Sequence, residues 1–314
     1  MGSAAAASTS NASPGRIVSI NPATGVPLGD VPDLGADAVK AAVARARAAQ
    51  QAWGELGVGE RCRRVARFAD VLMDRSDEVI DLIVKEGGKT RLEALGTEVA
   101  VVADLTRYFV KHAARALAPE PIPLHLMRHR ASYVHYVPRG VVAVIAPWNF
   151  PFSIPMGEVV MSLIAGNGCV LKPSEMTPLI ALKAKELIDA AGLPQELFQV
   201  VTGRGPAGAA LIDAGVDYVV FTGSVATGKR VAAACGERLI PCTLELGGKA
   251  PAIVCADADL SRAAQAIVWG GFANSGQVCC SVERVYAHEN VHDELVRRIV
   301  DETRALRQGD ASGA

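Results

Sequence analysis

Two adjacent cysteines, Cys279 and Cys280, stand in the stretch FANSGQVCCSV at residues 272–282. The residues before them predict a helix that ends near Asn274, so both thiols fall in a loop. Loops on a rigid scaffold often carry catalytic groups, and a cysteine thiolate is a strong nucleophile. A buried and inert cysteine is the alternative interpretation. The pair alone does not decide between them, so the other polar residues have to be considered.

Two further motifs contain groups that would assist a nucleophile. LELGGK at 244–249 places Glu245 between leucines, where desolvation can raise a carboxyl pKa into the range of a general base. PWNFP at 147–151 holds Asn149 between two prolines, where its amide can point into a cleft and stabilise an oxyanion. The alternatives are a glutamate turned to solvent and an asparagine bonded to nearby backbone.

A phosphate-binding corner is predicted in FTGSVATGK, residues 221–229. A strand ends at Thr222, Gly223 permits a tight turn, and Ser224 can cap a helix whose free N–H groups suit a phosphate. Gly228 would let that helix pack closely on the sheet. The spacing is not GxGxxG, and an ordinary strand–helix corner is the alternative.

LKPSE at 171–175 adds a cation and a carboxylate after another strand. Lys172 can donate to ribose hydroxyls. Glu175 can accept from a ribose diol and would repel a 2′-phosphate, which favours NAD over NADP. A solvated lysine and a glutamate at a helix N-terminus are the alternatives.

The elements that must position these groups change character along the chain. Apolar spacings of three and four predict helices over 36–53, 61–88 and 91–117, and the proline-rich stretch 118–125 follows. Beyond it, strands and helices alternate, which indicates an α/β fold with a parallel sheet. Because ligands of such sheets bind at the carboxyl ends of the strands, the motifs above stand where a site is expected.

The individual elements follow from the apolar runs and the glycine and proline positions. Strands are expected at 131–140, 141–147, 168–174, 197–203, 217–223, 251–257 and 284–289. Helices are expected at 177–192, 205–215, 224–238, 260–274 and 291–307.

Composition excludes several classes of protein. The chain has 314 residues, half of them hydrophobic, which is enough for a sizeable core and two domains. A formal net charge of −1 argues against nucleic acid or an anionic membrane surface as a partner. Seven cysteines without a CxxC pair argue against a disulfide framework or a metal site, and favour a reducing cytoplasm. No apolar run suggests a membrane span, and residues 1–15 are expected to form a disordered tail.

PWNFP, LKPSE, FTGS, LELGGK and GQVCC occur in the order and approximate spacing of the aldehyde dehydrogenase superfamily, which the sequence resembles over almost its whole length. The resemblance implies that Cys279 is the nucleophile and Glu245 the general base. Asn149 would form the oxyanion hole together with the backbone N–H of Cys279. Cys280 matches an auxiliary position that varies in the family.

The same resemblance implies a cofactor site and a substrate tunnel. Lys172 and Glu175 match adenine-ribose contacts, and Ser224 with its helix matches the pyrophosphate site. Further matched positions are Trp148 and Thr222 beside the nicotinamide, and Phe150, Ser153 and Gly157 along the aldehyde tunnel. A bulky residue often stands in relatives where this chain has Gly157, so a medium-sized aliphatic or aromatic aldehyde is expected.

The implied reaction is NAD-dependent oxidation of an aldehyde to a carboxylic acid. A Rossmann-like NAD-binding domain is expected over 16–245, with part of an oligomerisation hairpin near 121–140, because the family forms homo-oligomers. Residues 246–314 would begin an α/β catalytic domain, of which the family's last third has no counterpart here. Two alternatives therefore stay open: a cofactor-binding fragment without turnover, and a non-catalytic partner of a complementing chain.

Overall fold

The computed structural model describes residues 15–311, so most of the predicted N-terminal tail lies outside the described residues. Its centre is a parallel sheet of five strands in the order β7-β6-β5-β8-β9. The strands are β5 (Val141–Ile145), β6 (Gly168–Lys172), β7 (Phe198–Val200), β8 (Tyr218–Gly223) and β9 (Cys242–Leu246). The chain builds outward from β5 to β7, then returns to the other side of β5. The switch point between β5 and β8 is the place where doubly wound sheets bind ligands.

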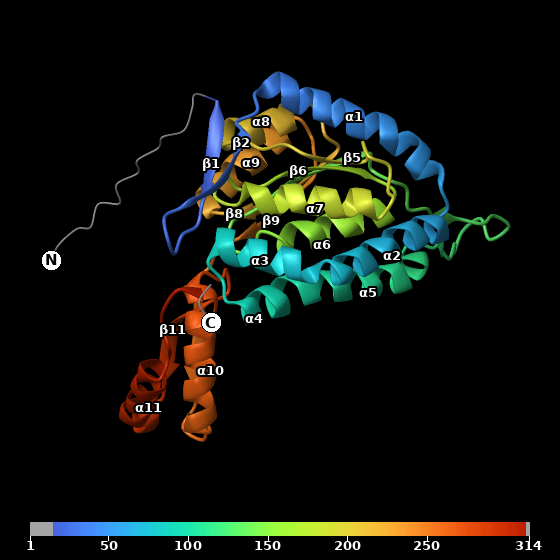
Figure 1. Cartoon of the computed structure of the whole chain (residues 1–314). Coiled ribbons are helices and arrows are strands. Elements are labelled where there is room, and N and C mark those ends of the chain that lie inside the picture. Colours follow the sequence, from blue (N-terminus) through green and yellow to red (C-terminus); the bar gives the residue numbers. More distant parts are fainter. Residues whose placement is uncertain (1–14, 312–314) are drawn as a thin grey trace.

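Helices cover both faces of this sheet (Figure 1). One face carries α1 (Ala36–Glu55), α8 (Gly205–Asp213) and α9 (Val225–Glu237). The other carries α6 (Ser153–Ile164) and α7 (Pro178–Ala190), which are covered in turn by α2 (Val58–Asp74), α3 (Ser76–Gly87) and α5 (Ala100–Ala116). A short α4 (Arg91–Ala94) and a π-helical turn, Leu95–Val99, lead into α5.

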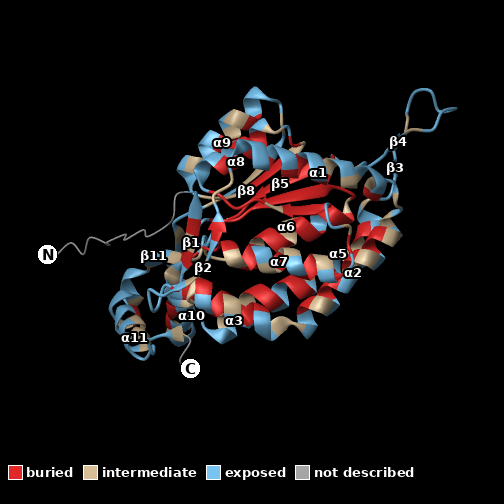
Figure 2. Ribbon diagram, turned by 45° about the horizontal axis from the view of Figure 1, so that its top comes forward, coloured by how far each residue is buried: buried red, intermediate tan, exposed pale blue. Residues whose placement is uncertain are grey.

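The central strand β5 is buried throughout, as its unbroken apolar sequence predicts (Figure 2). Val141, Ala143 and Ile145 pack on the side of α1 and α8. Val142 and Val144 pack on the opposite side, under α6. Strand periodicity therefore divides one apolar run between two cores.

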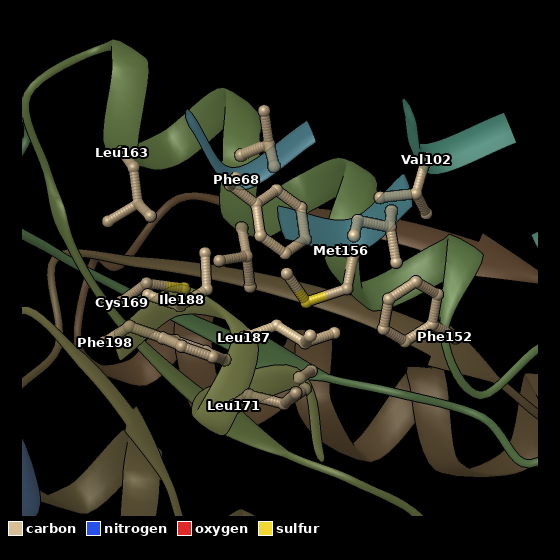
Figure 3. Packing of buried hydrophobic residues seen from close by; sticks show 14 of the residues in the cluster. Phe68, Val102, Phe152, Met156, Leu163, Cys169, Leu171, Leu187, Ile188 and Phe198 are labelled. Atoms are coloured by element: carbon tan, nitrogen blue, oxygen red, sulfur yellow. The ribbon is translucent and has the colours of Figure 1, made fainter. Parts of the chain in front are cut away.

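The larger core lies between the sheet and the helix layer of α6 and α7 (Figure 3). Phe152, the residue before α6, and Met156 of α6 belong to one buried cluster with Leu171 and Phe198 of the sheet and Phe68 of α2. This packing holds the start of α6 against the sheet, directly after the PWNFP motif.

Three small units complete the fold. The hairpin of β1 (Arg16–Ile20) and β2 (Pro27–Pro32), which the sequence patterns did not predict, is antiparallel, as are β3 (Glu120–Pro121) and β4 (Tyr133–Val134). The C-terminal lobe contains β10 (Ala250–Val254), α10 (Leu260–Phe272), β11 (Val282–Ala287) and α11 (His292–Arg304). It projects from the main body in Figure 1 and has its own small apolar cluster.

Two predicted elements differ from the structure. The helix expected over 61–88 is broken at Arg75, whose backbone leaves the helical region between α2 and α3. The strand expected over 131–140 contains only Tyr133–Val134, because its exposed residues have no neighbouring sheet to extend. The alternating pattern there indicated extended backbone, while pairing depended on a partner strand.

Candidate active site

A cleft of about 960 Å³ opens at the switch point of the sheet. It is bordered by Trp148 after β5, by Lys172 and Glu175 at and just beyond the end of β6, and by Thr222, Gly223 and Ser224 at the end of β8. The structure therefore brings six of the predicted cofactor residues to one cleft. Gly205 and Gly208 of α8 contribute backbone without side-chain bulk.

The start of α9 faces this cleft and is shaped for close packing. Ser224 is the N-cap, and its hydroxyl accepts a hydrogen bond of 3.3 Å from the N–H of Thr227. A Cβ atom at Gly228 would lie only 2.6 Å from Leu246 Cδ2, so glycine lets α9 approach β9. The helix thus presents its N-terminus, where an anionic group is stabilised, to the cleft.

Lys172 and Glu175 form an ion pair at the end of β6, with 3.6 Å between Lys172 Nζ and Glu175 Oε2. Burial lowers the pKa of Lys172, while the charge of Glu175 opposes that shift. The carboxylate of Glu175 is the more exposed partner. A cation and a carboxylate are thus available for hydroxyl groups, and the cleft fits a dinucleotide in size and in polar groups.

Asn149 joins this cleft to the cysteine loop. Its Nδ2 donates a hydrogen bond of 2.8 Å to the carbonyl oxygen of Gln277. Asn149 and Cys279, 130 positions apart in the sequence, are therefore held in adjacent loops. One of the two N–H groups of the Asn149 amide is left for another acceptor.

Cys279 is exposed at the end of that loop. Partial burial of the thiol raises the pKa of Cys279 above its usual value of 9.0, and the neighbouring Cys280 raises it further. The LELGGK motif reaches the same loop, because a Cβ atom at Gly248 would lie 3.7 Å from the carbonyl oxygen of Cys279. The following Ser281 anchors the loop to α10 through a bond of 3.1 Å to the Gly270 oxygen.

Glu245 is an exposed residue of β9. Its neighbours Leu244 and Leu246 pack against the core beneath α9, so strand alternation turns Glu245 toward the opposite face of the sheet. Glu158 of α6 lies near it: burial raises the pKa of Glu158, and the negative charge of Glu245 adds to this. Glu245 is therefore directed toward α6. It stands three residues before Gly248, which contacts the cysteine loop.

The three residues predicted along a substrate tunnel lie at the start of α6, outside the lining of the cleft described above. Phe150 packs beneath the ammonium of Lys89, 3.8 Å from its ring centre. Ser153 is buried, and its N–H donates to Glu98 over 2.7 Å. A Cβ atom at Gly157 would lie 3.5 Å from Leu105 of α5, so α5 borders the space that the missing side chain leaves.

Sequence reasoning missed a buried polar cluster behind these loops, formed by Lys89, Glu98 and Asn274. A signal for one member exists in the sequence. Glu98 stands four residues after Ala94 and four before Val102, both of which are buried, so helical periodicity places a carboxylate on the core face. A buried charge requires a partner, and here the partner is Lys89.

Within residues 15–311, no group of three or more histidine, cysteine, aspartate or glutamate side chains is arranged to hold a metal ion. Over the same residues, none of the helices combines the length and the hydrophobicity that a bilayer-spanning segment requires.

Comparison with known proteins identifies relatives over nearly all of the chain. Residues 9–313 match the aldehyde dehydrogenase family. A putative succinate-semialdehyde dehydrogenase [NADP(+)] 2 of Mycobacterium ulcerans is 39% identical over 288 residues, which cover 92% of this chain and 55% of that protein. A putative succinate-semialdehyde dehydrogenase [NADP(+)] of Mycolicibacterium smegmatis is also 39% identical, over 90% of this chain and 55% of that protein. The chain thus spans about half the length of these curated relatives.

Solved structures give the same result. Lactaldehyde dehydrogenase from Escherichia coli superposes with a TM-score of 0.90 at 36% identity, covering 95% of this chain and 62% of that one. PnpE in complex with nicotinamide adenine dinucleotide superposes with a TM-score of 0.90 at 35% identity, covering 95% of this chain and 61% of that one. The motifs, the doubly wound sheet and these matches agree: the chain belongs to the aldehyde dehydrogenase family.

Proposed function

We propose that the protein oxidises an aldehyde to a carboxylic acid with NAD, using Cys279 as the nucleophile. The observation that supports this best is the hydrogen bond between Asn149 Nδ2 and the Gln277 oxygen. It holds an amide donor and a cysteine loop together at the edge of a dinucleotide-sized cleft. Nucleophilic attack on a carbonyl carbon needs this combination of groups.

In the proposed mechanism, the Cys279 thiolate forms a bond to the aldehyde carbon. The resulting oxyanion accepts hydrogen bonds from the free N–H of the Asn149 amide and from the backbone N–H of Cys279. NAD held in the cleft would supply the hydride acceptor, so that the carbon–hydrogen bond of the adduct breaks and a thioester on Cys279 remains. Glu245 then takes a proton from water, which attacks the thioester and releases the acid and the thiolate.

We assign the cofactor to the switch-point cleft, with the pyrophosphate at the start of α9 and the adenine ribose at Lys172 and Glu175. NAD is preferred over NADP in this proposal because the carboxylate of Glu175 would repel a 2′-phosphate. The mycobacterial relatives are named as NADP(+) enzymes, and PnpE was solved with nicotinamide adenine dinucleotide. Measuring turnover with both cofactors decides between them.

For the substrate we infer a medium-sized aliphatic or aromatic aldehyde, admitted beside Phe150, Ser153 and Gly157. Residues 16–245 would form the cofactor domain and 246–314 the first part of the catalytic domain. The hairpin near 121–140 is assigned to homo-oligomer contacts, and neither nucleic acid nor a membrane is a proposed partner. A free catalytic thiol requires a reducing compartment, for which we propose the cytoplasm.

The test is NADH formation from a panel of aldehydes ranging from acetaldehyde through hexanal, benzaldehyde and succinate semialdehyde. Cys279→Ala should abolish the signal. Glu245→Gln should retain the first burst of NADH but slow steady turnover by about 10²- to 10⁴-fold, since it removes only the general base. A Cys279→Ala variant with unchanged turnover contradicts the proposed nucleophile.

Cofactor binding without turnover is the second candidate. The cofactor cleft is lined by several elements, whereas Cys279 is exposed. This difference favours a chain that binds the cofactor but does not turn over. Near-attack geometry is strict, so a small displacement of the exposed cysteine would remove most of the rate. Calorimetry that shows NAD binding, together with no NADH from any aldehyde, would favour this candidate over the first.

A further inference from the structure

Lys89 is a buried cation with a defined set of partners. It follows the turn at the end of α3, where Gly88 adopts the left-handed conformation with φ of 71°. The side chain is 1% exposed, and its ammonium lies 3.0 Å from Asn274 Oδ1 and 3.4 Å from Glu98 Oε1. Burying a lysine is costly unless such partners are present. Asn274 and Glu98 offset this cost, and Lys89 lies directly behind the candidate active site.

The ammonium determines which way the Asn274 amide points. Lysine can only donate hydrogen bonds, so the oxygen of the amide must face Lys89 and its NH₂ group must face away. That NH₂ group donates to the carbonyl oxygens of Asn149, over 3.1 Å, and Gln277, over 3.2 Å. Asn274 therefore contacts both loops, the one with the oxyanion amide and the one with the nucleophile.

The Gln277 oxygen accepts from Asn149 as well as from Asn274, so two amides converge on one carbonyl. On the other side of Lys89, the Glu98 carboxylate accepts the N–H groups of Phe152 and Ser153 over 3.0 and 2.7 Å. These are the first unpaired amides of α6, which has no side-chain cap of its own. The cluster thus holds both Asn149 and the backbone that follows it.

We propose that Lys89 is a positioning residue for the oxyanion hole, acting through Asn274 to orient the Asn149 amide against the nucleophile loop. Lys89 touches neither the cofactor cleft nor the reacting atoms in this scheme. The inference rests on the proposed roles of Cys279 and Asn149. Its effect should appear in the acylation step rather than in cofactor binding.

The test uses p-nitrophenyl acetate, an activated ester that needs no cofactor. The Cys279 thiolate forms a bond to the acetyl carbon, the carbon–oxygen bond breaks, and p-nitrophenolate leaves in a measurable burst. Lys89→Met should lower the burst rate constant by about 10²-fold, the usual effect of losing one oxyanion donor. The burst amplitude and the affinity for NAD should stay within twofold of the wild type.

Two further variants separate positioning from folding. Asn274→Asp keeps an acceptor for Lys89 but cannot donate to the two carbonyls, so it should reproduce the Lys89→Met loss in a folded protein. Lys85→Met, at an exposed lysine in the last turn of α3, is the matched control and should change nothing. In an Asn149→Ala background, Lys89→Met should cause no further loss, because its effect passes through Asn149.

Nuclear magnetic resonance of the asparagine side-chain amides gives a readout that is independent of activity. In the wild type, the Asn149 NH₂ group should exchange slowly with water, and Lys89→Met should remove this protection. An unchanged Asn149 signal in Lys89→Met, or additive losses with Asn149→Ala, would overturn the positioning role. A wild type with an ester burst but no NADH from any aldehyde would overturn the dehydrogenase proposal and leave the positioning role supported.

Discussion

At the scale of single residues, Cys279, the proposed nucleophile, carries a thiol whose pKa is raised. Partial burial and Cys280 both raise its pKa, so little thiolate is present near neutrality. A thiol with a raised pKa reacts more slowly at neutral pH and continues to gain reactivity into the alkaline range.

The pH dependence of Cys279 alkylation tests this. The rate of reaction with iodoacetamide should rise about tenfold per pH unit and level off at a higher pH than for a cysteine in an unstructured peptide. In Cys280→Ala the plateau should shift to lower pH, because a contribution that raises the pKa has been removed. Mass spectrometry of the Cys279 peptide measures both rates, and a plateau at or below that of the free thiol would contradict the raised pKa.

Glu175 makes the second prediction at this scale. Its carboxylate borders the cleft, and repulsion of a nearby charge in a partly solvated site amounts to about 1–4 kcal/mol. Glu175→Gln should therefore improve the ratio of NADP to NAD binding by about tenfold or more. Titration calorimetry with both cofactors measures the ratio. The exposed Glu55→Gln at the end of α1, outside the lining of the cleft, serves as control, and an unchanged ratio in Glu175→Gln would show that the carboxylate does not discriminate.

At the scale of elements, buried glutamates cap helices from a distance. Glu86 of α3 accepts the N–H groups of Leu179 and Ile180 at the start of α7, both over 2.9 Å, and Glu98 does the same for α6. Each glutamate thus replaces the missing side-chain cap of a helix that follows a site motif. The outer helix α3 and the π-helical turn before α5 thus help to determine where the inner helices begin.

The contact between α9 and β9 gives a prediction at this scale. Gly228→Val would insert side-chain atoms where even a Cβ lies 2.6 Å from Leu246 Cδ2. The helix must move, which should lower the free energy of unfolding by about 1–3 kcal/mol and weaken NAD binding by at least tenfold. Urea unfolding and calorimetry measure the two effects.

Gly236→Val is the matched control for that experiment. It lies in the same helix, and a Cβ there would meet nothing within 4 Å. It should leave NAD affinity and stability close to those of the wild type, since valine is about as compatible with a helix as glycine or better. Equal losses in the two variants would mean that close packing at Gly228 is not what matters.

At the scale of the whole molecule, the main body and the C-terminal lobe differ in how much they bury. The sheet is enclosed between helix layers, whereas the lobe has one parallel strand pair, β10–β11, and a small cluster. Ile253 and Trp269 of the lobe are 75% and 74% exposed. The cysteine loop is therefore attached to the lobe that has the smaller apolar cluster.

Hydrogen exchange should reveal this difference. Amides of β5 and β6 should exchange only through global unfolding, while those of β10 and β11 should exchange at least about 100-fold faster. A two-stranded sheet has little independent stability, which is the physical reason. Mass spectrometry of the deuterated chain gives the rates, and equal protection of β5 and β10 would contradict the prediction.

Much of the fold could be predicted from local sequence patterns. Glycines, prolines and strand-length apolar runs predicted the alternation of strands and helices from β5 to α9, and the motifs at the ends of those strands were predicted to meet at one edge. The helix break at Arg75 and the π-helical turn that carries Glu98 left little local trace. The apolar residues keep nearly the same helical spacing across such interruptions, so their periodicity could not locate the break or the π-helical turn.

The burial of Lys89 and its partners was decided only by folding. Lys89 and Asn274 are 185 positions apart, and their bond exists because α3, α6 and the loop after α10 pack together. The sequence pattern indicates the preferred secondary structure of each segment, through its hydrophobic period, its helix caps and its turn residues. Whether a charged side chain is solvated or becomes the centre of a polar cluster depends on segments remote in the chain, and only their packing removes the water.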